Sequence, residues 1–284
     1  MPLEEISVLA TGLRLRELKI TIPKGPAEFL IAAYVDARAL YSSAGARFFC
    51  DPDDQVTAEV GGVRARLETK EDVEILHEQF VARIYNFACR GAVVVWDIGM
   101  NTGFASLFFA RNAETHVIGF EPSRTTYEKA LRNFSLNPHL SGRIRAFNSG
   151  IGDSDSVRPF YSNSARPTVS GLYPIPESLA PERFGSTEQV TIQRASSVLR
   201  GIRENFPDRK IFAKIDCEGS EYQIIRELCK SNAIQLLDWV ALEWHRREEN
   251  QDPAVLADLF LECGFRVFLL GPERGESGML YATR

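Results

Sequence analysis

The sequence predicts an α/β fold in which a mostly parallel β-sheet ends in an antiparallel hairpin. Two patterns in the 284-residue chain indicate this fold. From residue 92 onward, apolar β-branched segments alternate with helical segments, which is typical of a parallel sheet covered by helices on both faces. The last two apolar segments are joined by a short Gly/Pro turn without room for a crossover helix, so the last two strands must be antiparallel.

The expected elements of this sheet follow one another regularly. We expect strands at residues 92–97, 115–120, 143–148, 210–216, 238–244, 265–270 and 278–283, with a short strand at 156–161 pairing beside the third of these. We expect helices at residues 70–90, 103–112, 124–136, 195–205, 219–231 and 253–263. Residues 162–188 are rich in Pro, Ser and Gly and lack hydrophobic periodicity, which predicts a long loop.

Residues 1–68 differ in character and predict a small α+β extension ahead of a domain at residues 69–284. An apolar helical stretch lies within residues 26–49, and residues 56–67 have the pattern of a β-hairpin. Gly61 and Gly62 can supply the positive φ angles of a two-residue turn. Pairing outward from this turn gives one apolar face and one charged face, with Val60 opposite Val63, Ala58 opposite Ala65, Val56 opposite Leu67, and Glu59 opposite Arg64.

The composition excludes some classes of partner. The net charge of −5 and the scattered arginines do not favour nucleic-acid binding. No apolar run approaches about 18 residues, so no membrane span is expected, and the acidic start of the chain does not resemble a secretory signal. The five cysteines are odd in number and lack zinc-site spacing, which favours reduced thiols in a cytoplasmic protein. The oligomeric state stays open.

The first predicted strand leads into a glycine loop with the pattern D-x-G-x-N-x-G. Asp97 ends the strand, and Gly99, Asn101 and Gly103 follow before a helix. Strand, glycine loop and helix are how an open α/β sheet binds a nucleotide-like cofactor, because glycines let the backbone approach the ligand. The carboxylate of Asp97 is placed to orient the loop and to accept a hydrogen bond from an ammonium group of the cofactor.

The ends of the second and third strands supply further candidate contacts. Glu121 lies 24 residues after Asp97, close to the spacing at which an acid binds ribose hydroxyls. Asn148 and Ser149 are placed to edge an adenine ring. For Asn148, a plain turn-forming role is nearly as good an explanation.

The fourth and fifth strands end in ionisable residues suited to catalysis. Alternation along the fourth strand puts Lys214 and Asp216 on one side, and Glu218 follows them. Glu221 has an alternative explanation as a first-turn acid favoured by the helix dipole. The fifth strand ends in Glu243-Trp244-His245, where a histidine could accept a proton near neutral pH.

Together these segments resemble the FkbM family of S-adenosylmethionine (SAM)-dependent methyltransferases. The resemblance covers roughly residues 75–284. It is carried by D-I-G-M-N-T-G, F-E-P-S, N-F-S-L-N, K-I-D-C-E-G-S-E and A-L-E-W-H. The family implies a Rossmann-like class I methyltransferase sheet and methyl transfer to hydroxyl oxygens of sugars or secondary metabolites. Met100 stands where a small residue is usual, and its flexibility predicts only a local adjustment.

The sequence thus predicts an O-methyltransferase acting on a small-molecule acceptor such as a sugar, glycan or natural product. Either Asp216 or His245 is expected to be the base, with Glu218 and Glu243 orienting the substrate. Asp216, Glu218 and Glu243 would also suit Mg²⁺, although the spacing does not require a metal. The loop at 162–188 and the N-terminal extension are expected to cap the site.

Two alternatives remain open. A nicotinamide-dependent oxidoreductase would share the sheet, but the third glycine of its fingerprint is missing and the terminal hairpin argues against it. A non-catalytic SAM-binding module would share the cofactor loop. Unbroken motifs at every strand end argue against it.

Overall fold

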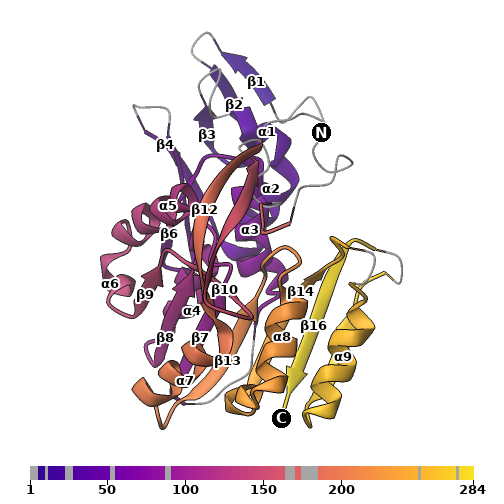
Figure 1. Cartoon of the computed structure of the whole chain (residues 1–284). Helices are drawn as coiled ribbons and strands as arrows, with labels where there is room; N and C mark the ends of the chain where they lie inside the picture. The colour runs from indigo at the N-terminus through magenta and orange to yellow at the C-terminus, as the bar shows by residue number, and fades with distance from the viewer. Residues whose placement is uncertain are drawn as a thin grey trace.

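In the computed structural model of the protein, strands and helices alternate from Val93 to the C-terminus except at residues 144–194 and 266–283, where the described elements are consecutive strands (Figure 1). The structure describes residues 6–9, 12–22, 28–51, 55–86, 91–163, 170–173, 185–248, 251–272 and 275–284.

Seven strands form the central sheet. They are β7 (Val93–Ile98), β8 (Thr115–Phe120), β9 (Ile144–Phe147), β13 (Lys210–Ile215), β14 (Trp239–His245), β15 (Arg266–Leu270) and β16 (Ser277–Thr283). Their order is β15-β16-β14-β13-β7-β8-β9. Only β16 is antiparallel to its neighbours, so the predicted terminal hairpin is confirmed, and β16 lies between β14 and β15. This is a Rossmann-like α/β sheet.

The strand order reverses direction between β7 and β13. Ligands of open α/β sheets bind beyond the carboxyl ends of the strands at such a switch point.

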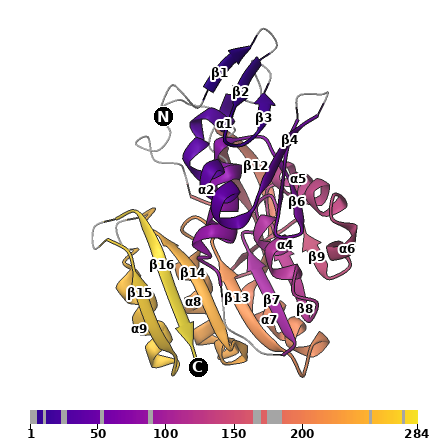
Figure 2. The ribbon, with the colours of Figure 1, turned by 180° about the vertical axis from the view of Figure 1, so that it is seen from behind.

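Helices cover both faces of the sheet (Figures 1 and 2). On one face lie α4 (Phe104–Ala110), α5 (Arg124–Ser135) and α6 (Pro138–Ser141). On the other lie α7 (Ala195–Asn205), α8 (Glu221–Lys230) and α9 (Pro253–Glu262), with the short 3-10 helix η5 (Ala233–Leu236). Strand β7 is buried along its whole length, with Val93 and Val95 in one core and Val94 and Trp96 in the other.

The N-terminal extension contains the predicted hairpin. Its β-structure comprises β1 (Ile6–Leu9), β2 (Gly12–Leu15), β3 (Ile20–Ile22), β4 (Arg47–Cys50), β5 (Val56–Val60) and β6 (Val63–Leu67), and its helices are α1 (Phe29–Ala32) and α2 (Tyr34–Ala44). The predicted register of β5 and β6 is confirmed, and Glu59 and Arg64 form an ion pair across it.

The helix predicted at residues 70–90 is shorter in the structure. It comprises α3 (Lys70–His77) and a π-helical turn, η3 (Glu78–Ala82). Arg83 then adopts a positive φ of 55°, which a right-handed helix cannot continue through. The prediction over residues 87–90 lies outside the described residues.

A second, smaller sheet replaces part of the predicted loop. It contains β10 (Gly150–Gly152), β11 (Ser156–Asn163) and β12 (Gly185–Arg194) in the order β10-β12-β11. The prediction that residues 156–161 pair beside the third strand is therefore wrong, because β11 pairs with β12 instead. The predicted loop at 162–188 is wrong at both ends, where β11 finishes and β12 begins, and its residues 164–169 and 174–184 lie outside the described residues.

Two further expectations concern the chain as a whole. Across the described ranges, no helix has the length and apolar character needed to cross a membrane. The cysteines in the described part of the chain form no disulfide bond, although the sulfurs of Cys229 and Cys263 lie 3.1 Å apart. Cys89 lies outside the described residues.

Candidate functional site

A cavity of about 250 Å³ opens at the switch point, beyond the carboxyl ends of β7, β8, β13 and β14. Its walls include the loop at residues 99–102, the segment at residues 121–123 and the segment at residues 216–218. Three of the strand ends singled out in the sequence therefore meet at one cavity.

The glycine loop is shaped by contacts that only glycine permits. Gly99 has a φ of 74°, and a Cβ there would overlap the backbone carbonyl oxygen of Asp216. Gly103 has a φ of 84°, and its Cβ would lie 2.6 Å from the ring of Phe134. The loop therefore packs tightly against β13 on one side and α5 on the other.

Met100 fits this loop because of a glycine on the neighbouring strand. Its side chain is buried, and a Cβ on Gly119 would lie 2.5 Å from the Met100 sulfur. The missing side chain at Gly119 thus accommodates the long thioether.

Asp97 lies beneath the loop and does not line the cavity. It is fully buried, its Oδ2 accepts a hydrogen bond of 2.6 Å from Ser106 Oγ, and its Oδ1 lies 3.4 Å from Lys214 Nζ. Burial raises the pKa of Asp97, while the Lys214 ammonium opposes this effect. This position of Asp97 favours a role in supporting the glycine loop over the predicted contact with an ammonium group of the cofactor.

Lys214 joins the glycine loop to the end of β13. As alternation predicts, it shares a side of β13 with Asp216, and its Nζ lies 3.3 Å from Asp216 Oδ2. The ammonium also donates to the carbonyl oxygen of Gly99. Burial alone would lower the pKa of Lys214, but Asp216 and Asp97 outweigh burial and raise it above the usual value. Lys214 is therefore a fixed cation rather than a proton carrier.

Glu121 lines the cavity next to the glycine loop and is held by backbone amides. Its Oε2 accepts from the Asn101 N–H at 3.0 Å, and its Oε1 accepts from the Ser123 N–H at 2.9 Å. Burial raises its pKa to about 7, with both hydrogen bonds acting in the opposite direction. Both oxygens are thereby fixed at the cavity wall.

Asn148 and Ser149 do not line the cavity. Asn148 Nδ2 donates to the carbonyl oxygens of Glu121 and Pro122, and Ser149 Oγ accepts from Gln193 Nε2 at 2.7 Å. Both side chains therefore brace the segments around the cavity.

Part of the cavity wall is formed by residues that sequence reasoning missed. They are Gly150, Ile151, Phe160 and Ile192, whereas Leu172 lies in the 162–188 segment that was expected to cap the site. The missed residues come from the β10-β12-β11 sheet, whose strands show weak alternation, so no sequence signal placed them at the site.

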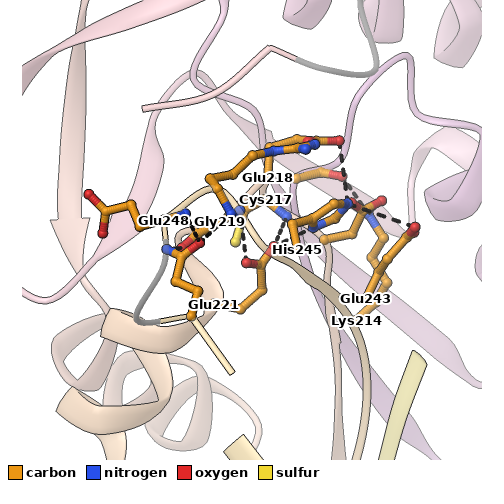
Figure 3. A network of polar contacts seen from close by, with 12 residues as sticks. Lys214, Cys217, Glu218, Gly219, Glu221, Glu243, His245 and Glu248 are labelled. Carbon is orange, nitrogen blue, oxygen red and sulfur yellow. Dashed lines mark hydrogen bonds and ion pairs between the residues drawn. The ribbon is translucent and has the colours of Figure 1, made fainter. Parts of the chain in front are cut away.

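A buried network connects β14 to the start of α8 (Figure 3). Glu221 is fully buried and accepts from the backbone amides of Cys217 at 2.9 Å and Gly219 at 2.8 Å. His245 Nδ1 lies 3.0 Å from Glu221 Oε1, and its Nε2 lies 3.5 Å from Glu218 Oε1. Glu221 thus has the helix-start role that the sequence left open, with an added contact to His245.

The charge state of His245 follows from these carboxylates. Burial lowers its pKa, but Glu221 and Glu218 outweigh burial and raise it to about 10. His245 does not line the cavity. A histidine protonated at neutral pH cannot accept a proton, so this environment favours Asp216 over His245 as the base.

Tyr85 is a site residue that sequence reasoning missed. Its hydroxyl lies 3.3 Å from both Asp216 Oδ2 and Glu243 Oε2, and it lines the cavity. Burial and the charge of Asp216 raise the pKa of Glu243 to about 8, with His245 opposing. Tyr85 follows the end of η3, where no periodic pattern could indicate its direction.

Asp216, Glu218 and His245 offer potential metal-ligand atoms within 4.8 Å of one another. This set contains His245, whereas the sequence suggested Glu243 as the third ligand. The protonated imidazole already supplies a positive charge between the carboxylates, and a metal would have to displace its proton. The geometry gives no independent support for Mg²⁺.

The fold is a Rossmann-like α/β sheet with a cavity at its switch point, and comparison with known proteins identifies the family. The model of the methyltransferase FkbM domain matches residues 97–267. The chain belongs to the FkbM methyltransferase family.

Individual relatives are more distant. Methyltransferase sdnD of Sordaria araneosa is 30% identical over 154 residues, which is 46% of this chain and 58% of that protein. The chain thus spans less than two thirds of that relative.

Among solved structures, methyltransferase FkbM from Methylobacillus flagellatus has 18% identity and a TM-score of 0.43, covering 69% of this chain and 44% of that one. Another structure is Sp1610 from Streptococcus pneumoniae, assigned as a tRNA (m1A22) methyltransferase and solved in complex with S-adenosyl-L-methionine. It has 11% identity and a TM-score of 0.40, and the match covers 72% of each chain.

Proposed function

We propose that this protein is a SAM-dependent methyltransferase that methylates a hydroxyl oxygen of a small molecule such as a sugar or natural product. The observation that carries the proposal is the cavity wall formed jointly by the glycine loop and Glu121. The Glu121 carboxylate is bound to the loop through the Asn101 amide, so one rigid unit offers both a backbone cradle and two acceptor oxygens.

The residues present fit this cofactor. Gly99 and Met100 lie at the cavity floor, where a side chain at residue 99 has no space. Glu121 would accept hydrogen bonds from the two ribose hydroxyls. The apolar side chains of Ile151, Phe160 and Ile192 would flank the adenine. When bound, SAM supplies an activated methyl group, so the protein must mainly align the acceptor and remove a proton.

Asp216 is the residue that we assign as the base. It lines the cavity and is oriented by Lys214 at 3.3 Å and by the Tyr85 hydroxyl at 3.3 Å. Lys214 and Tyr85 are positioning residues, because they hold the carboxylate toward the acceptor hydroxyl. Asp216 would accept the hydroxyl proton as the oxygen–methyl bond forms.

Titration calorimetry with SAM, S-adenosylhomocysteine (SAH) and NAD tests the cofactor. We expect SAM and SAH to bind and NAD to show no heat of binding. NAD binding without SAM binding would support the oxidoreductase alternative. Undetectable SAM binding by folded protein would contradict the proposal.

The base assignment predicts the behaviour of Asp216→Asn. We expect SAH affinity within about threefold of wild type and a fall in kcat of at least about 100-fold, the usual contribution of general base catalysis. Turnover would be measured with the best acceptor from a panel of sugars and natural products, and the exposed Glu204→Gln on α7 serves as control. A near-normal kcat for Asp216→Asn would place the base elsewhere. If the wild-type protein binds SAM but methylates no acceptor in the panel, a SAM-binding module becomes the better explanation.

A further inference from the structure

One wall of the cavity is formed by acidic residues from the helix that joins the extension to the sheet domain. Glu71, Glu74 and Glu78 lie three and four positions apart on α3 and η3, and therefore share one helix face. They line the same cavity as Asp216 and Glu243. Among the described lining residues, Lys214 is the only lysine or arginine.

Glu71 and Glu78 are the acids of this wall that form no ion pair among the described residues, and the negative charge of Asp216 acts on Glu78. Glu74 pairs with Lys70 at 2.5 Å, and Asp216 pairs with Lys214. Burial first, and then the negative charges of Asp216 and Glu74, raise the pKa of Glu78 to about 7, with the Lys214 ammonium opposing them. A cation bound beside Glu78 would therefore favour the ionised form of this carboxyl group.

A second and independent observation indicates a ligand at this wall. Gln79 also lines the cavity and is only 1% exposed, yet its Oε1 has no hydrogen-bond donor among the described residues. Buried polar oxygens are normally satisfied. A ligand with an N–H or O–H donor would supply the missing hydrogen bond to Gln79 Oε1.

The wall comes from a part of the chain that the family match does not cover. The FkbM domain match begins at Asp97, whereas the acids and Gln79 lie at residues 71–79. The glycine loop and Glu121 lie within the match. Because the proposed cofactor site lies within the family match and this wall lies outside it, we expect the wall to contact the methyl acceptor and not the cofactor.

We propose that the acceptor carries a protonated amine in addition to its hydroxyl group, as in an amino sugar, and that the ammonium binds against Glu78 with Gln79 Oε1 accepting a hydrogen bond. This proposal rests on the proposed methyltransferase function. A charge-assisted hydrogen bond in a largely buried site favours the amine over a neutral analogue by about tenfold or more.

Calorimetry on the SAH complex tests this proposal with matched sugar pairs. The probes are glucosamine with glucose and galactosamine with galactose. We expect at least one amino sugar to bind about tenfold or more tightly than its neutral partner. Glu78→Gln should remove this preference and leave SAH affinity unchanged, whereas Glu204→Gln should leave both unchanged.

The outcomes separate this inference from the proposed function. If SAH binds but no amino sugar binds preferentially, or if Glu78→Gln keeps the preference, the inference is overturned and the methyltransferase proposal stands. If Glu78→Gln weakens SAM about tenfold but does not weaken SAH, which lacks the sulfonium charge, Glu78 serves the sulfonium and the inference is again overturned. If SAH itself does not bind, the proposed function fails.

Discussion

Gly99 lets the glycine loop pack against the end of β13. Its positive φ and its contact with the Asp216 carbonyl let the loop pass directly over the end of β13. The D-x-G-x-N-x-G pattern predicted a close backbone approach to a ligand. The approach to β13 depends on tertiary packing and could not be predicted.

Gly99→Ala should therefore destabilise the protein and disrupt the cofactor site. Left-handed backbone costs an alanine about 1–2 kcal/mol, and overpacking adds about 1–3 kcal/mol. We expect the free energy of unfolding to fall by at least about 2 kcal/mol in urea denaturation. Gly201→Ala in α7 is the control, since no atom lies within 4 Å of its Cβ and helix propensity favours alanine by about 0.5–1 kcal/mol. Equal stability of the two variants would contradict this account.

Glu121 carries the ribose contact in the proposal. Glu121→Gln loses one acceptor oxygen and the negative charge, and hydrogen bonds to charged groups contribute about 1.5–3 kcal/mol. We expect SAM and SAH to bind about 10–100-fold more weakly by calorimetry. Glu128→Gln, an exposed acid on α5, should keep wild-type affinity. Unchanged SAH affinity in Glu121→Gln would show that this carboxylate does not bind the ribose.

The sequence predicted which strand ends carry functional groups better than it predicted how deep each group lies. Alternation correctly paired Lys214 with Asp216. It could not show that Asp97 turns into the core toward Ser106, or that Asn148 turns back to the Glu121 carbonyl. Those directions depend on neighbouring elements that local patterns do not contain.

At the scale of elements, His245 connects β14 to α8. Its protonated form is stabilised by Glu221 and Glu218, and its pKa is about 10, compared with about 6.5 in an unfolded chain. A raised folded-state pKa contributes stability that is fully present below about pH 6.5 and is lost as pH rises toward 10.

His245→Gln should therefore be more destabilising at pH 6.5 than at pH 9.5. Chemical denaturation of both proteins across this range measures the difference in unfolding free energy. We expect that difference to shrink steadily with rising pH. A difference that stays constant or grows would contradict protonation of His245 in the folded state.

The sequence predicted a strand at residues 156–161 but missed β10, β12 and the pairing of β11 with β12. Among the described residues, the buried apolar cluster between β11 and β12 is small and consists of Phe160, Val190 and Ile192. The 185–194 segment begins Gly-Ser-Thr-Glu-Gln, which resembles the loop before it. Strand β12 is stabilised because it pairs with the whole length of β11. A partner that lies far away in the sequence leaves no local signal in the β12 segment itself.

At the scale of the whole molecule, one hydrophobic core joins the extension to the sheet domain. It includes Val60 and Leu67 from the hairpin together with Phe104 and Phe134 from the domain. Asn137 strengthens the junction, because its side chain accepts from the Arg64 N–H and donates to the Arg64 carbonyl. The N-F-S-L-N segment, quoted as a family motif, thus contacts the extension.

This shared core predicts that residues 1–68 and 69–284 unfold together. The three tryptophans, Trp96, Trp239 and Trp244, all report on the sheet domain. Hydrogen exchange of the β5 and β6 amides reports on the extension. Their denaturant midpoints should coincide within error, and an earlier midpoint for the hairpin would indicate independent folding.

The sequence patterns predicted the sheet, the helices on both of its faces and the terminal hairpin. They did not predict the insertion of β16 between β14 and β15, or the acidic wall that α3 and η3 bring to the cavity. Both depend on how distant segments dock.

A crystal structure of the protein with SAH tests the central claim most directly. The account predicts the ribose hydroxyls within hydrogen-bond distance of Glu121, the homocysteine end over residues 99–102, and the thioether sulfur facing Asp216. SAH bound outside this cavity, or a ribose that does not contact Glu121, would contradict it.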